Sequence, residues 1–342
     1  MLTNDSITIV VGGLAVFGLA LVIAGVRRHR SRTRSAPGEQ QDDMQVKVEA
    51  ENEAQNPGAK IPVKQEFGRN GPPAASPVRL PLDFFGLVIA IMIPFWLFGG
   101  NKLPVPMDLP VSAFGFVAPM LVALILSYRR GGSDGVKALF RKGWVYPKNK
   151  FRIWILPILF LKPAIMILSY AVMRLAGLPL PDPQIPWLMT PVFFLVFFMA
   201  AIGEELGWMG YAFDPMQERW GALKASLILG LAWGLFHLIP DLQNGQAFNW
   251  ILWQRLGTVA ARVLIVWLYN NTGKSVLAAI LFHTMSNVSW VLFPNYGSHY
   301  DPFVTSLIIF LVAGIVIFGL ESSTLAGSRF SWLSRRTSRS SF

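Results

Sequence analysis

Residues 191–213 read PVFFLVFFMAAIGEELGWMGYAF, and this stretch decides the fold class. The run is long and apolar enough to cross a bilayer core, which takes about 20 residues as an α-helix. Two carboxylates, Glu204 and Glu205, stand side by side in its middle. Because a charged side chain at mid-bilayer costs on the order of 3 kcal/mol, an intramembrane carboxylate indicates a functional site by default.

Similar apolar runs recur along the chain. They lie near residues 6–26, 82–99, 111–128, 151–172, 224–240, 251–270, 275–293 and 303–320. Only 14% of the residues are charged, against about one-quarter in soluble proteins. We therefore predict an all-α polytopic membrane bundle of about nine transmembrane helices, an N-terminal anchor helix followed by an eight-helix core. With no cysteine in the sequence, disulfides, a Cys nucleophile and thiolate zinc ligands are excluded.

The basic residues predict the orientation. With the N-terminus outside, 25 of the 30 Lys and Arg residues fall in inner segments and 2 in outer loops, as the positive-inside rule requires. We predict an outer N-terminus and a cytoplasmic C-terminus in a multi-pass protein of the plasma membrane. The net charge of +11 then reflects membrane topology, and no nucleic-acid partner is expected.

Composition also divides the chain. We predict an N-terminal transmembrane anchor at 1–30, a membrane domain at 81–322 and a basic cytoplasmic tail at 323–342. Residues 31–80 are rich in Gln, Glu, Asp, Pro and Ser. Such a segment cannot bury a core, so we predict a disordered cytoplasmic linker there.

Two later spans also carry polar residues. His237 lies in LAWGLFHLIP, and His283 and Asn287 lie in LFHTMSN. At 1.5 Å per residue, Glu204 and His283 lie roughly 14 Å from the inner ends of their spans, and His237 and Asn287 roughly 20 Å. His283 and Asn287 share one helix face. We predict that these four residues surround one cavity.

Each of these residues also has a purely structural interpretation. A lone His or Asn in a membrane helix commonly hydrogen-bonds to a neighbouring helix. The Glu pair could mark a helix break at Gly203 and Gly207 that faces water. Polarity at one depth in three separate spans favours the shared site.

The chemistry of such a site is narrow. A carboxylate, two imidazoles and an amide suit the activation of a water molecule, with Glu accepting its proton and His and Asn stabilising an oxyanion. A metal held by His and Glu could activate the water instead. The soluble zinc-protease motif His-Glu-x-x-His is absent from the sequence.

These residues resemble the CPBP family (CAAX protease and bacteriocin-processing, or Abi) of intramembrane proteases. That family shows the motifs Glu-Glu-x-x-x-Arg, Phe/Trp-x-x-x-His and His-x-x-x-Asn on separate spans. Here they read Glu204-Glu205-Leu-Gly-Trp-Met209, Trp233-Gly-Leu-Phe-His237 and His283-Thr-Met-Ser-Asn287. The resemblance covers about 150–294, more weakly back to about 82, and implies that 81–322 is an intramembrane protease domain.

The resemblance also implies roles. Glu204 would activate water, Glu205 would support it, His237 would hold the water or a metal, and His283 and Asn287 would form the oxyanion side. If a metal is used, the implied ligands are Glu204, His237 and His283. The implied cofactor is zinc, with a metal-free glutamate mechanism as the alternative. The implied substrate is a membrane-associated peptide or protein.

One position departs from the family, because its motif Arg is Met209 here. Arg255 and Arg262 lie seven residues apart on one face of a later span. Snorkelling or headgroup pairing suits Arg255, whereas Arg262 is deep enough to replace the missing cation beside the Glu pair. We expect Arg262, or a bound metal, to supply that charge.

Two other functions stay open at this point. One is a non-catalytic membrane immunity or interaction protein on the same fold, which the missing Arg favours. The other, less expected, is a proton-coupled transporter that uses Glu204 and Glu205 as a relay.

Overall fold

The structure is a computed structural model that describes residues 80–99, 111–145, 148–319 and 324–326. The predicted anchor at 1–30 lies outside the described residues, as do the linker and the basic tail except for Leu80 and residues 324–326. The predictions for these segments therefore stay predictions.

The described part of the chain is a helical membrane bundle, as predicted. Its elements are α3 (Leu82–Phe98), η1 (Val111–Val117), α4 (Ala118–Gly143), α5 (Lys148–Leu175), α6 (Thr190–Gly207), η2 (Trp208–Phe213), α7 (Asp214–Trp220), α8 (Ala222–Phe236), α9 (Leu238–Gln243), α10 (Phe248–Asn271), α11 (Val276–Leu292) and α12 (Pro302–Gly319). Six helical segments are long and apolar enough to cross a membrane, and α3 and α11 are shorter apolar helices. Each of the eight spans predicted between 82 and 320 coincides with one of these segments.

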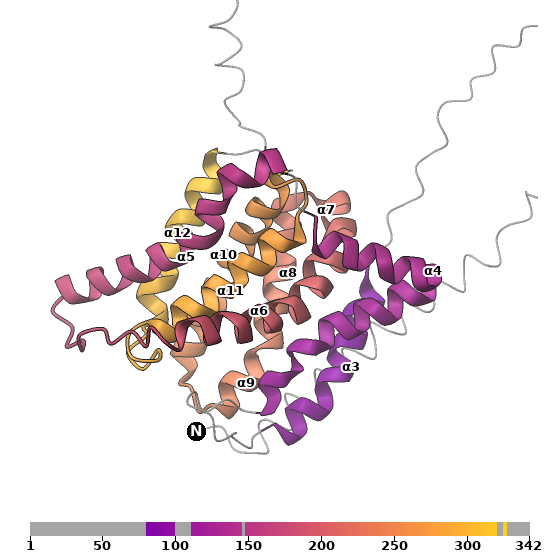
Figure 1. Cartoon of the computed structure of the whole chain (residues 1–342). Helices are drawn as coiled ribbons and strands as arrows, with labels where there is room; N and C mark the ends of the chain where they lie inside the picture. The colour runs from indigo at the N-terminus through magenta and orange to yellow at the C-terminus, as the bar shows by residue number, and fades with distance from the viewer. Residues whose placement is uncertain (1–79, 100–110, 146–147, 320–323, 327–342) are drawn as a thin grey trace, which may run out of the picture.

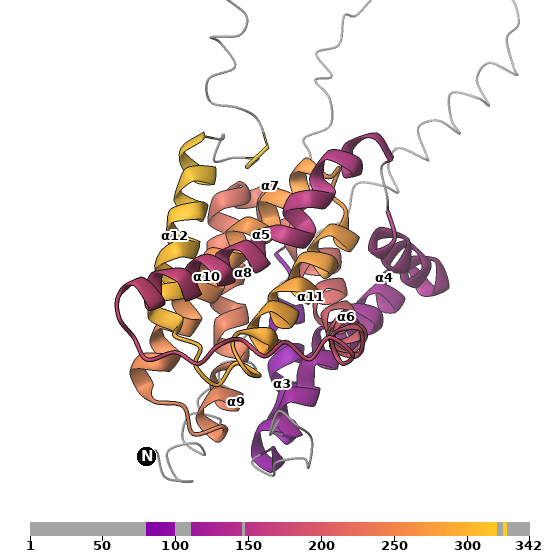
Figure 2. The ribbon, with the colours of Figure 1, turned by 60° about the vertical axis from the view of Figure 1, so that its left-hand side comes forward.

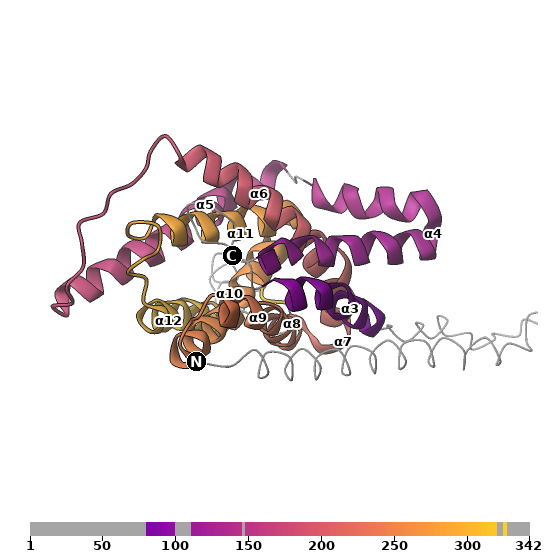
Figure 3. The ribbon, with the colours of Figure 1, turned by 90° about the horizontal axis from the view of Figure 1, so that it is seen from below.

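The central helices form two layers (Figures 1 and 2). Helix α10 packs between α8 and α12 in one layer, and α11 packs between α5 and α6 in the other. Seen from below, the two rows lie face to face, with α3 and α4 beyond α6 and α8 at one side (Figure 3). The contact between α10 and α11 joins the layers.

Helix α4 is longer than predicted and folds back on itself (Figure 3). Its backbone leaves helical geometry at Gly131 and Gly132, and Gly132 has a φ of 56° that suits glycine. The predicted span ends at residue 128, close to this break, and a second helical stretch that was not predicted then runs to Gly143.

Two glycines let α8 approach α10 closely. A Cβ atom on Gly230 would lie 2.9 Å from the Cα of Val259 and 3.1 Å from the Cβ of Arg262, and one on Gly234 would lie 3.7 Å from the Cβ of Arg255. Small residues four apart are a common means of close packing between membrane helices. The spacing brings both arginines of α10 against α8.

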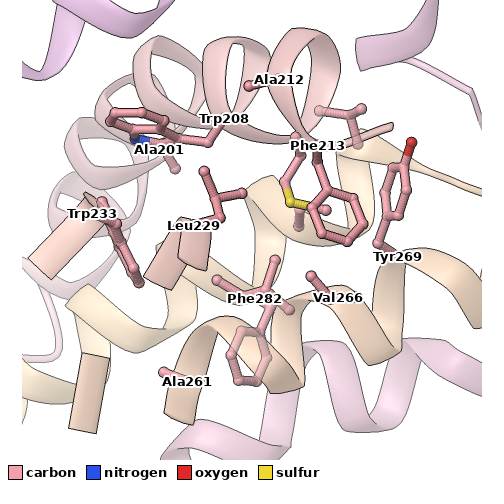
Figure 4. Close-up of a cluster of buried hydrophobic side chains, with 14 of the residues drawn as sticks. Ala201, Trp208, Ala212, Phe213, Leu229, Trp233, Ala261, Val266, Tyr269 and Phe282 are labelled. Carbon is pink, nitrogen blue, oxygen red and sulfur yellow. The ribbon is translucent and has the colours of Figure 1, made fainter. Parts of the chain in front are cut away.

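The chain changes from α- to π-helix directly after the Glu pair. Segment η2 begins at Trp208, and its residues Trp208, Met209 and Phe213 are buried. Figure 4 shows Trp208 and Phe213 facing the interior side chains of α8, α10 and α11. Short π-helical turns within α-helices occur frequently at functional sites.

Candidate active site

Glu204 and Glu205 lie in the last turn of α6 and are both buried. The side chain of Glu204 is 6% exposed and that of Glu205 is 0% exposed. The flanking glycines do not break the helix. A Cβ on Gly203 would lie 2.8 Å from the Phe116 ring, and one on Gly207 would lie 2.5 Å from the Pro119 backbone. The water-facing helix break is therefore wrong, because these glycines let α6 pack against η1 and α4.

Glu205 has a hydrogen-bond partner at each oxygen. Arg262 Nη1 donates to Glu205 Oε2 at 2.7 Å, and His283 Nδ1 lies 2.9 Å from Glu205 Oε1. Because an ionised carboxylate can only accept hydrogen bonds, Nδ1 of His283 must carry the hydrogen. The other ring nitrogen, Nε2, is left for another partner. All three side chains are at most 3% exposed, so Glu205 is fully paired away from water.

Glu204 has weaker and more accessible partners. The indole Nε1 of Trp233 donates to Glu204 Oε2 at 2.6 Å. His237 Nε2 lies 3.9 Å from Glu204 Oε1, beyond a direct hydrogen bond. His237 Nδ1 lies 2.9 Å from the Trp233 carbonyl oxygen and must donate to it. In the neutral ring, Nε2 is then an acceptor that faces Glu204, and the ring is 29% exposed.

Trp233 contacts residues of both carboxylate environments, the one around Glu204 and the one around Glu205. The guanidinium of Arg262 lies 4.1 Å from the centre of its ring, and the ring of His283 is 5.0 Å away. The cation–π contact, worth about 2 kcal/mol when desolvated, accounts for a buried guanidinium whose Nε and Nη2 have no hydrogen-bond partner among the described residues. No separate role was predicted for Trp233, although its place as the aromatic residue of the second motif was the available signal.

Asn287 lies one turn beyond His283 on α11. It is half-buried and makes no hydrogen bond within the described part of the chain. The structure thus brings Glu204, Glu205, His237 and His283 together around Trp233, and leaves the Asn287 amide free on the same helix face as His283.

Arg262 supplies the positive charge that Met209 lacks. Met209 is 0% exposed in η2, and the cation on Glu205 comes from α10 instead. The expected pairing of Arg262 with the Glu pair is confirmed. The headgroup interpretation of Arg255 is wrong, because its side chain is 17% exposed and Nε lies 2.9 Å from Asp241 Oδ2.

The donors proposed for a metal do not fit one. Among the described residues, no three His, Cys, Asp or Glu side chains are grouped to hold a metal ion. His237 faces Glu204, whereas His283 directs Nδ1 at Glu205.

The region that carries these residues is similar to known proteins. Residues 186–289 match the Rce1-like family, described as "Type II CAAX prenyl endopeptidase Rce1-like". This stretch of the chain is therefore similar to the CAAX-protease family. The matched stretch contains all five predicted site residues. The chain is also 27% identical over 218 residues to "CAAX prenyl protease 2" of Methanococcus maripaludis, covering 59% of this chain and 79% of that protein. Together with the apolar helices, the family indicates a multi-pass membrane protease.

Proposed function

We propose that the chain is an intramembrane endopeptidase that uses Glu204 to activate water without a metal. The observation that supports this most is the 3.9 Å separation of Glu204 Oε1 and His237 Nε2. Two acceptors at that distance accommodate one water molecule that donates a hydrogen to each of them. Glu204 takes the proton as the water oxygen attacks the peptide carbonyl, and then passes it to the leaving amine.

His283 and Asn287 are proposed to stabilise the oxyanion that this attack creates. His283 donates from Nδ1 to Glu205, so it donates from Nε2 only as an imidazolium.

The proposed substrate is a membrane-associated peptide or protein. The matched relative is named for CAAX prenyl substrates, so the panel that tests this proposal contains prenylated and unmodified peptides in lipid vesicles. Cleavage by the purified wild type, detected by mass spectrometry, is expected for at least one class.

Glu204→Gln is expected to lose that cleavage, while Glu218→Gln, which changes an exposed glutamate of α7, keeps it. Equal cleavage by the Glu204 variant and wild type would refute the proposal. The non-catalytic alternative drew its support from the missing motif Arg, and Arg262 now supplies that charge.

A further inference from the structure

His237 occupies a break between two helices. It ends α8, and α9 starts at the next residue. Its ring is packed edge-on against Trp233 and Phe236, with centroids 5.7 and 5.1 Å away. A side chain at a helix break depends on whatever holds the second helix, because no continuous backbone ladder fixes the angle between the two segments.

Helix α9 is only six residues long, and it is held at two points. Asp241 Oδ1 accepts from Arg255 Nη2 of α10 at 3.3 Å, and Arg255 Nε lies 2.9 Å from Asp241 Oδ2 as an ion pair. Gln243 Nε2 donates to the Trp96 carbonyl oxygen of α3 at 2.6 Å. The first anchor is an ion pair on α10, and the second is a single neutral hydrogen bond.

The ion pair acts close to His237. The backbone N–H of Asp241 donates to the His237 carbonyl oxygen at 3.1 Å, so Asp241 belongs to the turn that His237 begins. Gly234, one turn before, lets the backbone and side chain of Arg255 approach α8 without an intervening Cβ. Asp241 and Arg255 are 13% and 17% exposed, so water screens their pair only in part.

We propose that Arg255 and Asp241 are positioning residues that hold the His237 imidazole at the distance from Glu204 needed for a bridging water. This rests on the proposed function for its catalytic consequence, whereas the orientation of His237 is a separate structural statement. Helix α10 then contributes to the surroundings of both Glu205 and His237. Arg262 pairs with Glu205, and Arg255, two turns earlier on the same face, holds the segment that positions His237.

The kinetic test is a double-mutant cycle on the purified full chain. Arg255→Gln and Asp241→Asn are each expected to lower kcat by about 10- to 100-fold with KM unchanged, the effect of displacing a reacting group by about 1 Å. The double variant is expected to be no worse than either single variant, since both break one interaction. Arg255→Lys is expected to recover part of the loss. Arg174→Gln, which removes an exposed Arg–Asp pair, is the matched control and keeps wild-type kcat.

A spectroscopic test separates this inference from the proposed function. In wild type, ring-¹⁵N NMR is expected to show His237 with its hydrogen on Nδ1, assigned by loss of the signal in His237→Gln. In Arg255→Gln and Asp241→Asn, that signal is expected to shift or broaden, whether or not the protein cleaves any peptide. An unchanged His237 signal in both variants, or kinetic losses that simply add in the double variant, would overturn the proposal.

Discussion

The two adjacent carboxylates of α6 have opposite surroundings. Glu205 is 0% exposed and receives a guanidinium on one oxygen and an imidazole on the other. Glu204 receives one indole N–H and faces a half-exposed imidazole nitrogen across 3.9 Å. Consecutive residues on a helix point about 100° apart, so one turn of α6 serves two different environments.

This difference bears on the proposed roles of the two carboxylates. Both oxygens of Glu205 already have hydrogen-bond partners, so Glu205 is a poor proton acceptor for a substrate. A carboxylate with an open oxygen can take a proton and return it, as a general base must. The contrast supports the proposal that Glu204 is the reacting group and that Glu205 orients His283.

The largest expected effect is on activity at Glu204. Removing a general base typically costs about 10²- to 10⁴-fold in rate, so Glu204→Gln should lower kcat by that amount. Its melting temperature should stay near that of wild type, because Trp233 Nε1 can donate to the amide oxygen of Gln. Cleavage assays and thermal melts in detergent measure both. A large drop in melting temperature would mean that Glu204 is structural and that the contrast with Glu205 is wrong.

Asn287 should show the next largest effect. An amide that donates to an oxyanion is worth about 10²- to 10³-fold in kcat, so Asn287→Ala should lower kcat with little change in KM or stability. The free amide has no partner within the described residues to lose. A variant with wild-type kcat would remove Asn287 from the site, and Ser286→Ala, whose hydroxyl already bonds to the Phe282 carbonyl, serves as the control on the same helix.

The thermal stability of Arg262 variants tests the ion pair between Arg262 and Glu205. Removing one partner of a buried ion pair costs about 3–5 kcal/mol, so Arg262→Met should lower the melting temperature strongly. The double variant Arg262→Met with Glu205→Gln should melt above the single one, because no unpaired charge stays buried. Met209→Arg added to Arg262→Met should restore part of the stability by returning a cation to the family's position. If Arg262→Met alone melts like wild type, the ion pair contributes nothing and the comparison fails.

The close packing of α8 on α10 should give a smaller effect. Gly230→Ala would place a Cβ 2.9 Å from the Val259 Cα, and overpacking of this kind costs about 1–3 kcal/mol. Gly314→Ala in α12 is the matched control, since a Cβ there meets nothing within 4 Å. Its expected change is neutral to slightly stabilising, because Ala favours helix over Gly by about 1 kcal/mol. Equal melting temperatures for the two variants would show that α8 can move away from α10 without loss.

Much of the bundle could be predicted because bilayer thickness fixes the length of an apolar helix. The eight spans between 82 and 320 follow from hydrophobicity alone, and the depth of the polar residues follows from the helical rise. The fold-back of α4 could not be predicted this way, since Gly131 and Gly132 lie in a polar stretch where hydropathy carries no signal about helix.

Which residues form the site could be predicted more easily than which of them contact each other. Depth placed Glu204 and His283 in one layer, but rotation about each helix axis decides that His283 meets Glu205. That rotation is set by packing contacts such as Gly203 of α6 on Phe116, which hydropathy does not report. Arg262 was found because an intramembrane cation needs a partner. Asp241 was missed, although it lies one turn after His237 and its charge also needed a partner.

The smallest expected effect concerns metal removal. A bound metal would require Glu204, His237 and His283 to point at one ion, but among the described residues no three such side chains are grouped to hold one. Incubation with a strong chelator, followed by dialysis, should therefore leave kcat within about twofold of the untreated enzyme, well below the 10²-fold scale of a lost catalytic group. Zinc added back should change nothing, and metal analysis of the purified protein should give less than one equivalent. Loss of activity on chelation with recovery on zinc would place a metal between Glu204 and the two histidines and would refute the metal-free proposal. His283→Gln would then release the metal, whereas under the present assignment it lowers kcat without any change in metal content.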